Sequence, residues 1–306
     1  MRKEVGVIGL GNMGFGIASN LLKAGFHVFV YDIRPEPMDK LKAKGAVAVS
    51  GVREMARSCP LVFSVLLDYK QNLDNLTGPN GLFEGMDEGC SVFVCSTLSP
   101  EQVIELATIA KKRGIHLLDT PISGGSIGAD AGTLTIMIGG DANVLEENRK
   151  ALEAIGSNIF HMGEVGTGEF AKSINQMLVA THNVAAAEAM LLASKSRINL
   201  RQMYDIIITS HGYSLVFEQR AKRMIERDFT PKGVLRLLLK DTNIVMESAK
   251  SLGIVLPILG LVRQLFQAGV NAGLGDEDDS AIVKVLEKLS CYQLEENKKI
   301  FDRQRT

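Results

Sequence analysis

Short apolar runs alternate with polar, helix-like or glycine-rich segments through the first half of the chain. Runs bounded in this way are typical of buried strands. The first run, Val5–Leu10, is apolar on both faces, as a central strand of a parallel sheet must be. The expected strands are residues 5–10, 26–31, 61–67, 91–95, 115–119, 134–138 and 158–161, with a helix over 142–155 before the last. The pattern predicts an α/β domain with a doubly wound sheet.

The pattern changes to long amphipathic helices with few strand signals from Gly168 onward. The expected helices are roughly 168–196, 200–209, 214–226, 231–252, 258–273 and 279–297. Thr230-Pro231 is a start signal, a capping residue followed by proline at the first helical position. The alanine-rich stretch Ala180–Ala193 suggests a helix packed tightly inside the protein. We therefore predict an α/β domain over residues 1–165 and an all-α domain over residues 166–306.

A glycine-rich turn joins the first strand to the first helix. It reads Gly9-Leu10-Gly11-Asn12-Met13-Gly14. In a dinucleotide-binding turn the first glycine allows the sharp bend, the second lets the backbone approach a pyrophosphate, and the third lets the helix pack closely on the sheet. The start of that helix attracts the diphosphate with its free N–H groups and its dipole. The alternative is a glycine-rich turn in another kind of α/β domain, but strand, turn and helix together favour a Rossmann domain that binds the cofactor at residues 9, 11, 12, 13 and 14.

The second strand ends in Asp32, 18 residues beyond Gly14. A carboxylate there accepts hydrogen bonds from the adenosine ribose and repels a 2′-phosphate, which favours NAD over NADP. Arg34 weakens this preference, because an arginine there could pair with that phosphate. We expect both side chains to be in the cofactor site.

Composition narrows the classes of function. The chain has 306 residues, is 46% hydrophobic and carries a formal charge of −1, so it can bury a large core but does not attract nucleic acid or a membrane surface. We see no signal peptide and no uninterrupted apolar stretch long enough to cross a bilayer, and we expect a cytoplasmic protein. No metal site is expected. The four cysteines lack zinc-like spacing and are predicted to be buried, reduced thiols.

Two further segments carry candidate chemistry. Asp119–Ala129 contains a Ser-Gly-Gly turn directly after a strand, which suits a carboxylate, although a flexible loop explains it equally well. Gly163–Gln176 opens a helix on which Lys172 and Asn175, three residues apart, emerge from one face. Apolar neighbours suggest that this helix is buried, whereas an arbitrary helix lysine is usually a surface residue.

These motifs together resemble the β-hydroxyacid dehydrogenase family, which includes 3-hydroxyisobutyrate dehydrogenase and tartronate semialdehyde reductase. The resemblance covers nearly the whole chain and rests on GLGNMGFGIASNLLKAG, DTPISGGSIGADAGTLTIMIGG, GEVGTGEFAKSINQ and Leu239-Lys240-Asp241. It implies that Lys172 is catalytic and that Asn175 orients the reacting group. It also implies that Ser123, Gly124 and Gly125 hold the substrate carboxylate, and that the cofactor is contacted by Leu66, Leu67, Thr97 and Lys240.

One position departs from the family pattern: Gln176 stands where members often have a second asparagine. With residues 213–220 and the acidic stretch 275–280, the chain looks nearest to the sugar-acid branch typified by L-threonate dehydrogenase. The acidic stretch also has a plain explanation, because carboxylates at the start of the last helix complement its dipole. The basic residues at 220, 222, 223 and 227 are expected on a solvated helix face.

The expected reaction transfers a hydride between NAD(P), preferably NAD, and a small hydroxy acid such as 3-hydroxyisobutyrate, glycerate or a four-carbon sugar acid. Lys172 would serve as general acid and base, which requires its pKa to fall by roughly 2 to 3 units from about 10.4. The alternatives are a non-catalytic NAD-binding regulator and an imine reductase of the same fold. The all-α domain and the family resemblance both imply a homodimer or homotetramer.

Overall fold

The computed structural model describes residues 4–294 and divides the chain into two compact units, Met1–Lys172 and Ser173–Thr306. The division falls later than the predicted boundary at residue 165, because the start of the helix that follows residue 166 packs with the first unit. The first unit contains two hydrophobic cores and the second unit one.

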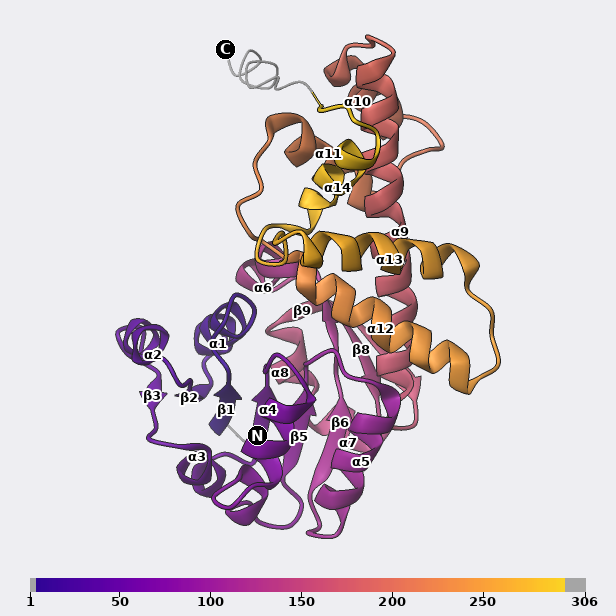
Figure 1. Cartoon of the computed structure of the whole chain (residues 1–306). Coiled ribbons are helices and arrows are strands. Elements are labelled where there is room, and N and C mark those ends of the chain that lie inside the picture. The colour runs from indigo at the N-terminus through magenta and orange to yellow at the C-terminus, as the bar shows by residue number, and fades with distance from the viewer. Residues whose placement is uncertain (1–3, 295–306) are drawn as a thin grey trace. The chain divides into compact units, whose positions relative to one another are not determined.

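The first unit is built on one sheet, which runs in the order β3-β2-β1-β4-β5-β6-β8-β7, with β9 paired to β8 (Figure 1). From β3 to β6 all neighbouring strands are parallel. The strands are β1 (Glu4–Ile8), β2 (His27–Tyr31), β3 (Val47–Ala48), β4 (Leu61–Ser64), β5 (Ser91–Val94), β6 (His116–Asp119), β7 (Ile122–Ser123), β8 (Leu134–Gly139) and β9 (Gly156–Gly163).

Helices cover both faces of this sheet, since alternate residues of one strand enter different cores. In β4, Leu61 and Phe63 belong to the core that contains Ile17 of α1, whereas Val62 belongs to the core that contains Met55 of α3. The doubly wound prediction is therefore confirmed. The helices are α1 (Gly14–Lys23), α2 (Pro35–Lys42), α3 (Val52–Ser58), α4 (Tyr69–Thr77), η1 (Leu82–Glu84), α5 (Pro100–Lys111), α6 (Gly125–Ala131), α7 (Ala142–Glu147) and α8 (Arg149–Glu153).

Two details of this unit differ from the prediction. Strand β8 runs antiparallel to β6 and β7, because only a short segment with the seven-residue helix α6 separates β7 from β8. The helix expected over 142–155 is two helices, α7 and α8. The break falls at Asn148, whose backbone is non-helical (φ −107°, ψ 7°) and whose side chain donates to the Val144 carbonyl oxygen.

The second unit consists of helices around one apolar core. Helix α9 begins in the first unit and continues into the second, where Ala180, Ala186, Ala187 and Ala193 are buried as predicted. The helices are α9 (Thr167–Lys195), α10 (Leu200–Ile208), α11 (Leu215–Glu226), α12 (Leu235–Ser251), α13 (Pro257–Asn271), η2 (Asp279–Ala281) and α14 (Ile282–Leu289).

Helix α12 does not begin at Thr230-Pro231. Lys232 donates its backbone N–H to the carboxylate of Asp278, and Val234 bridges the backbone of the same residue, so the chain is extended there. The helix starts only at Leu235, whose N–H donates to the Glu277 carbonyl oxygen. The capping signal was overruled by pairing with a segment far along the chain.

The last helix is shorter than the predicted 279–297. It ends at Leu289, and Cys291 adopts a left-handed backbone (φ 46°) that a helix cannot continue through. Residues 295–297 of that prediction lie outside the described residues. Cys291 is also exposed, contrary to the prediction, whereas Cys59, Cys90 and Cys95 are buried. Burial raises the pKa of both Cys59 and Cys95 to about 12.

Within residues 4–294, α9 is a helix long and apolar enough to cross a membrane by length and composition, which the sequence analysis did not foresee. Core helices of soluble proteins pass the same test, and α9 contributes many buried residues to the core of the second unit.

Candidate functional site

The order of strands reverses at β1, which lies between β2 and β4. The chain moves outward to β3 on one side and then to β5 and β6 on the other. In open α/β sheets, ligands bind outside the carboxyl ends of the strands at such a reversal. The predicted cofactor and substrate segments of the first unit all follow these strand ends: residues 9–14, 32–34, 66–67, 97 and 123–125.

The glycine turn is closely packed at its first and third glycines and open at its second. Gly9 has φ +85°, and a Cβ atom on it would lie 2.5 Å from the Val65 carbonyl oxygen. A Cβ on Gly14 would lie 1.9 Å from the Gly9 carbonyl oxygen. Gly11, by contrast, is exposed, and a Cβ there would meet nothing within 4 Å. The open space at Gly11, beside a turn closed at both ends, fits a cofactor diphosphate.

Asp32 joins the end of β2 to this turn. It is 8% exposed, and its carboxylate accepts the Leu10 N–H at 2.7 Å. Arg34 donates to the same carboxylate from its backbone N–H (2.8 Å) and from its guanidinium (3.1 and 3.3 Å). Burial raises the pKa of Asp32, but the bonds from Arg34 and Leu10 outweigh it and leave that pKa below its ordinary value. The arginine is thus paired within the chain, with its side chain 60% exposed.

The remaining predicted cofactor residues of the first unit lie in partly open positions. Met13 is partly buried and immediately precedes α1, and Asn12 is exposed. Leu66 is partly buried, and its side chain would meet a Cβ on Gly9 at 3.1 Å. Leu67 is 49% exposed. Thr97 is partly buried in the connection between β5 and α5.

The Ser-Gly-Gly turn connects β7 to α6. Ser123 is partly buried and pairs with Thr135 of β8, while Gly124 and Gly125 are exposed. The two glycines have φ +132° and +62°, values that other residues adopt only with strain. The turn is therefore an exposed backbone surface whose shape depends on both glycines.

Lys172 lies against this turn. Its side chain is buried (7% exposed), and its Nζ donates a hydrogen bond of 2.8 Å to the carbonyl oxygen of Ile122, the residue before Ser123. The amine is not solvated like an ordinary surface lysine, as the sequence analysis predicted. The structure brings together an amine from α9 and the proposed carboxylate-binding turn, 50 residues earlier in the chain.

Asp119, at the end of β6, holds the start of α9 beside that turn. Its carboxylate is fully buried and accepts the N–H groups of Gly166 (2.8 Å) and Glu169 (2.9 Å). Burial raises the pKa of Asp119, against the effect of these backbone bonds. Asp119 opens the Asp119–Ala129 motif, but no role was predicted for it. The signal was a carboxylate ending an apolar strand, where an unpaired charge would be costly.

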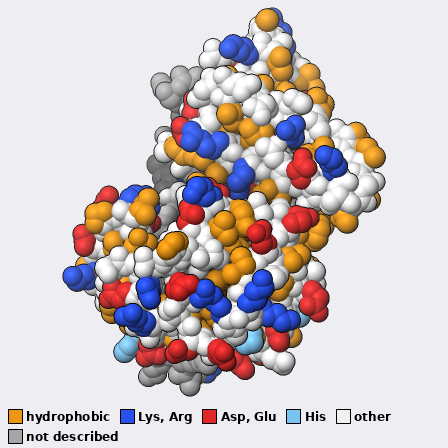
Figure 2. All heavy atoms as spheres, turned by 60° about the horizontal axis from the view of Figure 1, so that its bottom comes forward, with side chains coloured by type: hydrophobic (Ala, Val, Ile, Leu, Met, Phe, Trp, Pro, Cys, Tyr) orange, Lys and Arg blue, Asp and Glu red, His pale blue; other side chains and the backbone are white. Residues whose placement is uncertain are grey.

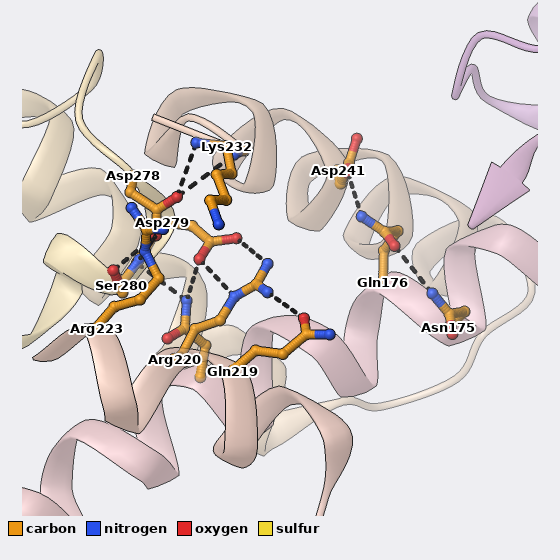
Figure 3. A network of polar contacts seen from close by, with 12 residues as sticks. Asn175, Gln176, Gln219, Arg220, Arg223, Lys232, Asp241, Asp278, Asp279 and Ser280 are labelled. Atoms are coloured by element: carbon orange, nitrogen blue, oxygen red, sulfur yellow. Dashed lines mark hydrogen bonds and ion pairs between the residues drawn. The ribbon is translucent and has the colours of Figure 1, made fainter. Parts of the chain in front are cut away.

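In the second unit, four polar side chains form a continuous chain of contacts, three of which, Asn175, Gln176 and Asp241, are shown in Figure 3. Asn175 Nδ2 donates to Gln176 Oε1 at 3.0 Å, and Gln176 Nε2 donates to Asp241 Oδ2 at 2.6 Å. The ammonium group of Lys240 lies 3.4 Å from Asp241 Oδ1. Both predicted residues of this unit, Asn175 and Lys240, therefore meet through Gln176 and Asp241.

The acidic stretch lies at the start of the last helical segment, where Asp278 accepts the Ser280 N–H as expected of a carboxylate there, and it also forms ion pairs. Each carboxylate pairs with a separate basic side chain, and Asn183 also donates to Asp279. Figure 3 shows the pairs at Asp278 and Asp279. The arginines are largely buried, with side chains 22% exposed at Arg220 and 10% at Arg223, so the predicted solvated face is wrong there. The pairs are Arg236–Asp276, Lys284–Glu277, Arg223–Asp278 and Arg220–Asp279.

A hollow of about 420 Å³ lies away from these residues. It is lined by Phe26, Leu61 and residues of α7 and α8. Phe26 and Leu61 stand at the amino ends of β2 and β4, opposite the edge at which ligands bind in such sheets.

On the face drawn in Figure 2, acidic and basic side chains are interspersed and neither sign dominates.

Two family models together match most of the chain. Residues 4–163 match the NAD binding domain of 6-phosphogluconate dehydrogenase. Residues 166–286 match a domain described as NAD-binding of NADP-dependent 3-hydroxyisobutyrate dehydrogenase. The two matches meet close to the start of α9.

Full-length relatives are also similar. The L-threonate dehydrogenase of Cupriavidus necator is 35% identical over 286 residues, covering 93% of this chain and 96% of the relative. The 2-hydroxy-3-oxopropionate reductase of Escherichia coli is 35% identical over 291 residues, covering 95% and 99%. A solved structure titled 3-hydroxyisobutyrate dehydrogenase, from Salmonella typhimurium, is 34% identical with a TM-score of 0.87, covering 92% of this chain and 99% of that one.

Proposed function

The chain belongs to the β-hydroxyacid dehydrogenase family and is an NAD(P)-dependent oxidoreductase, and we propose that it interconverts a small hydroxy acid and its carbonyl product with Lys172 as general acid and base. The observation that carries the role of Lys172 is its buried amine, which lies 2.8 Å from the carbonyl oxygen of Ile122, the residue before the Ser-Gly-Gly turn. That turn would hold the carboxylate of the substrate.

The nicotinamide, when bound, accepts or returns the hydride of the carbinol carbon. The residues of the chain would bind and orient the substrate and transfer the proton. Residues 123–125 would bind the acid end, and Asn175 would orient the reacting oxygen. Lys172 would take the hydroxyl proton during oxidation and return a proton to the carbonyl oxygen during reduction. Lys172 is buried, and its Nζ donates to the Ile122 carbonyl oxygen, which holds the amine beside the turn.

The test is a comparison of the wild type with Lys172→Ala. General acid–base catalysis is worth about 10²- to 10⁴-fold, so we expect kcat to fall by that factor. Cofactor affinity, measured by titrating the fluorescence of the reduced cofactor, is expected to change little because Lys172 lies at the substrate turn. A variant that keeps most of its turnover would remove Lys172 from the mechanism.

For the substrate we propose a four-carbon sugar acid such as L-threonate, supported by the 35% identical relative of that name. A panel of L-threonate, glycerate, serine, 3-hydroxyisobutyrate and a cyclic imine would be followed by absorbance of the reduced cofactor. Turnover of the imine alone would favour an imine reductase, and no turnover with any compound would favour a non-catalytic regulator. Related acids differ by only about 1 to 3 kcal/mol of pocket contacts, so the ranking of kcat/KM decides.

We also propose that NAD is preferred to NADP. The support is Asp32, whose carboxylate ends β2 and would repel a 2′-phosphate, with Arg34 engaged by that carboxylate. Arg34→Ala should leave the preference for NAD in place, whereas Asp32→Ala should release the arginine and raise the relative kcat/KM with NADP. Equal use of both cofactors by the wild type would overturn the preference.

We further propose that the chain assembles as a homodimer or homotetramer. The second unit exposes five large apolar side chains in the connection between α12 and α13 and in the first turns of α13, each more than half exposed. They are Leu252, Ile254, Val255, Ile258 and Leu261. A second copy of the chain would cover such a surface.

A further inference from the structure

Gln176 and Asp241 lie between two residues to which the proposed function gives separate tasks. Asn175 would orient the substrate, and Lys240 would contact the cofactor. Gln176 bonds to Asn175 at 3.0 Å and to Asp241 at 2.6 Å, and Asp241 pairs with Lys240 at 3.4 Å. We propose that Gln176 and Asp241 are positioning residues that fix the amide of Asn175 and the ammonium group of Lys240 through one shared carboxylate. This inference rests on the proposed function.

The carboxylate sets the direction of every bond in this chain. An ionised aspartate only accepts hydrogen bonds, so the NH₂ group of Gln176 must face Asp241. The carbonyl oxygen of Gln176 then faces Asn175 and takes one of its N–H donors. Rotating either amide by half a turn would set like groups against each other. Asn175 is therefore held in one orientation, with its carbonyl oxygen and its second N–H available to the reacting group.

Burial makes the arrangement strong. Asp241 is 7% exposed, and its side chain receives a charge-assisted hydrogen bond that is short at 2.6 Å. Because one carboxylate serves both Gln176 and Lys240, moving Asp241 would disturb both proposed contacts at once. The contact between Asn175 and the substrate would thus depend on a residue 65 positions away from Gln176.

The bond between Gln176 and Asp241 depends on the length of the glutamine side chain. Asparagine at this position is shorter by one methylene, roughly 1.5 Å of reach, and a 2.6 Å bond cannot be kept across that gap without backbone movement. An asparagine here could not make the same bond to this aspartate. The glutamine therefore matches the position of Asp241 in this chain.

The experiment compares Gln176→Asn, Asp241→Glu and the double variant. We expect Gln176→Asn to raise KM for the hydroxy acid about tenfold, the size of one lost charge-assisted bond, with a smaller change in kcat. Dissociation constants for the reduced cofactor, from fluorescence titration, report on Lys240 independently of turnover. Because Asp241→Glu adds the methylene that Gln176→Asn removes, the double variant should recover most of the lost KM and affinity.

Gln267→Asn is the matched control. It removes the same methylene from a surface glutamine of α13 whose amide donates to Asn271 at 3.0 Å, and it should change neither quantity. Thermal unfolding of each variant identifies any that fail to fold. A double variant that folds normally but is no better than Gln176→Asn would overturn the relay, as would a Gln176→Asn variant with unchanged KM and cofactor affinity. Failure of the proposed function would appear differently, as full activity of Lys172→Ala or no turnover of any hydroxy acid by the wild type.

Discussion

Gly11 and Gly14 lie in the same turn but differ in what an added methyl group would meet. A Cβ on Gly14 would lie 1.9 Å from the Gly9 carbonyl oxygen, while a Cβ on Gly11 would meet no protein atom within 4 Å. We expect Gly14→Ala to lower the free energy of unfolding by about 1 to 3 kcal/mol or more. Gly11→Ala should change it by no more than about 0.5 kcal/mol but weaken cofactor binding at least about tenfold.

Urea unfolding and titration with the reduced cofactor measure the two effects separately. If Gly11→Ala binds the cofactor as tightly as the wild type does, the diphosphate does not lie against this part of the turn. A Gly14→Ala variant as stable as the wild type would contradict the close approach of Gly14 to the Gly9 carbonyl oxygen.

Asp32 should make the free energy of unfolding depend on pH. Its folded pKa is lowered below the ordinary 3.8 by the bonds from Arg34 and Leu10, which outweigh burial. A lowered folded pKa means that the stabilisation is fully present above the unfolded pKa and disappears as pH falls through the folded value. We expect Asp32→Asn to be less stable than the wild type at neutral pH, and the difference to shrink below about pH 4. Urea titrations of both proteins across this range measure it, and a difference independent of pH would contradict the assignment.

Sequence motifs identified some residues of the candidate site and missed others for a physical reason. The glycine turn, the Ser-Gly-Gly turn and Lys172 could be found because their chemistry is local to a short segment. Asp119, Arg220 and Arg223 could not. The groups that they bind lie 47 to 59 residues away in the sequence, and only folding brings them together. From sequence alone, a basic residue on a helix is predicted to be exposed to solvent, because the position of its acidic partner is not known.

Among the elements, α1 and α6 pack closely enough to connect the two binding turns of the first unit. A Cβ on Gly16 of α1 would lie 2.7 Å from the backbone carbon of Ala129 in α6, and Asn20 donates to the Ala129 carbonyl oxygen at 2.6 Å. Helix α1 begins at the glycine turn and α6 at the Ser-Gly-Gly turn. Separating the helices should therefore disturb both turns.

We expect Gly16→Ala to destabilise the protein by about 1 to 3 kcal/mol and to raise KM for both cofactor and hydroxy acid. Gly260→Ala is the control. It lies in α13 with nothing within 4 Å of the added Cβ, so alanine should stabilise it by about 0.4 to 1 kcal/mol. Calorimetry and initial rates supply the two readouts. An increase in only one KM would show that the helices do not couple the turns.

Element boundaries were predictable where local chemistry sets them. The helix after Ser99 starts with a capping box and a proline, both readable from the sequence. At Thr230-Pro231 the same kind of signal failed, because residues 232–234 pair with Asp278. A local preference worth about 1 kcal/mol is overruled when distant groups, here the Asp278 carboxylate and the Glu277 carbonyl oxygen, accept the backbone N–H groups instead.

On the scale of the whole molecule, assembly can be tested on the exposed apolar stretch of the second unit. Val255 is 83% exposed and Leu261 is 66% exposed. If a second copy covers them, Val255→Glu with Leu261→Glu would bury charges in the contact and release smaller species. Sedimentation velocity should show a mass above that of one chain for the wild type and a lower one for the variant. Identical sedimentation would exclude this surface from the contact.

The division between the two units falls inside α9, after Lys172 and before Asn175. No break in the helix separates the proposed proton carrier from the amide that would steer its substrate. A gene fusion that joined the first unit to the second unit of a relative would take Lys172 and Asn175, to which the proposed function gives proton transfer and substrate orientation, from different parents. Shuffling of halves, which many two-domain enzymes tolerate, should yield working hybrids here only when the crossover lies before Gly166, so that one parent supplies the entire helix.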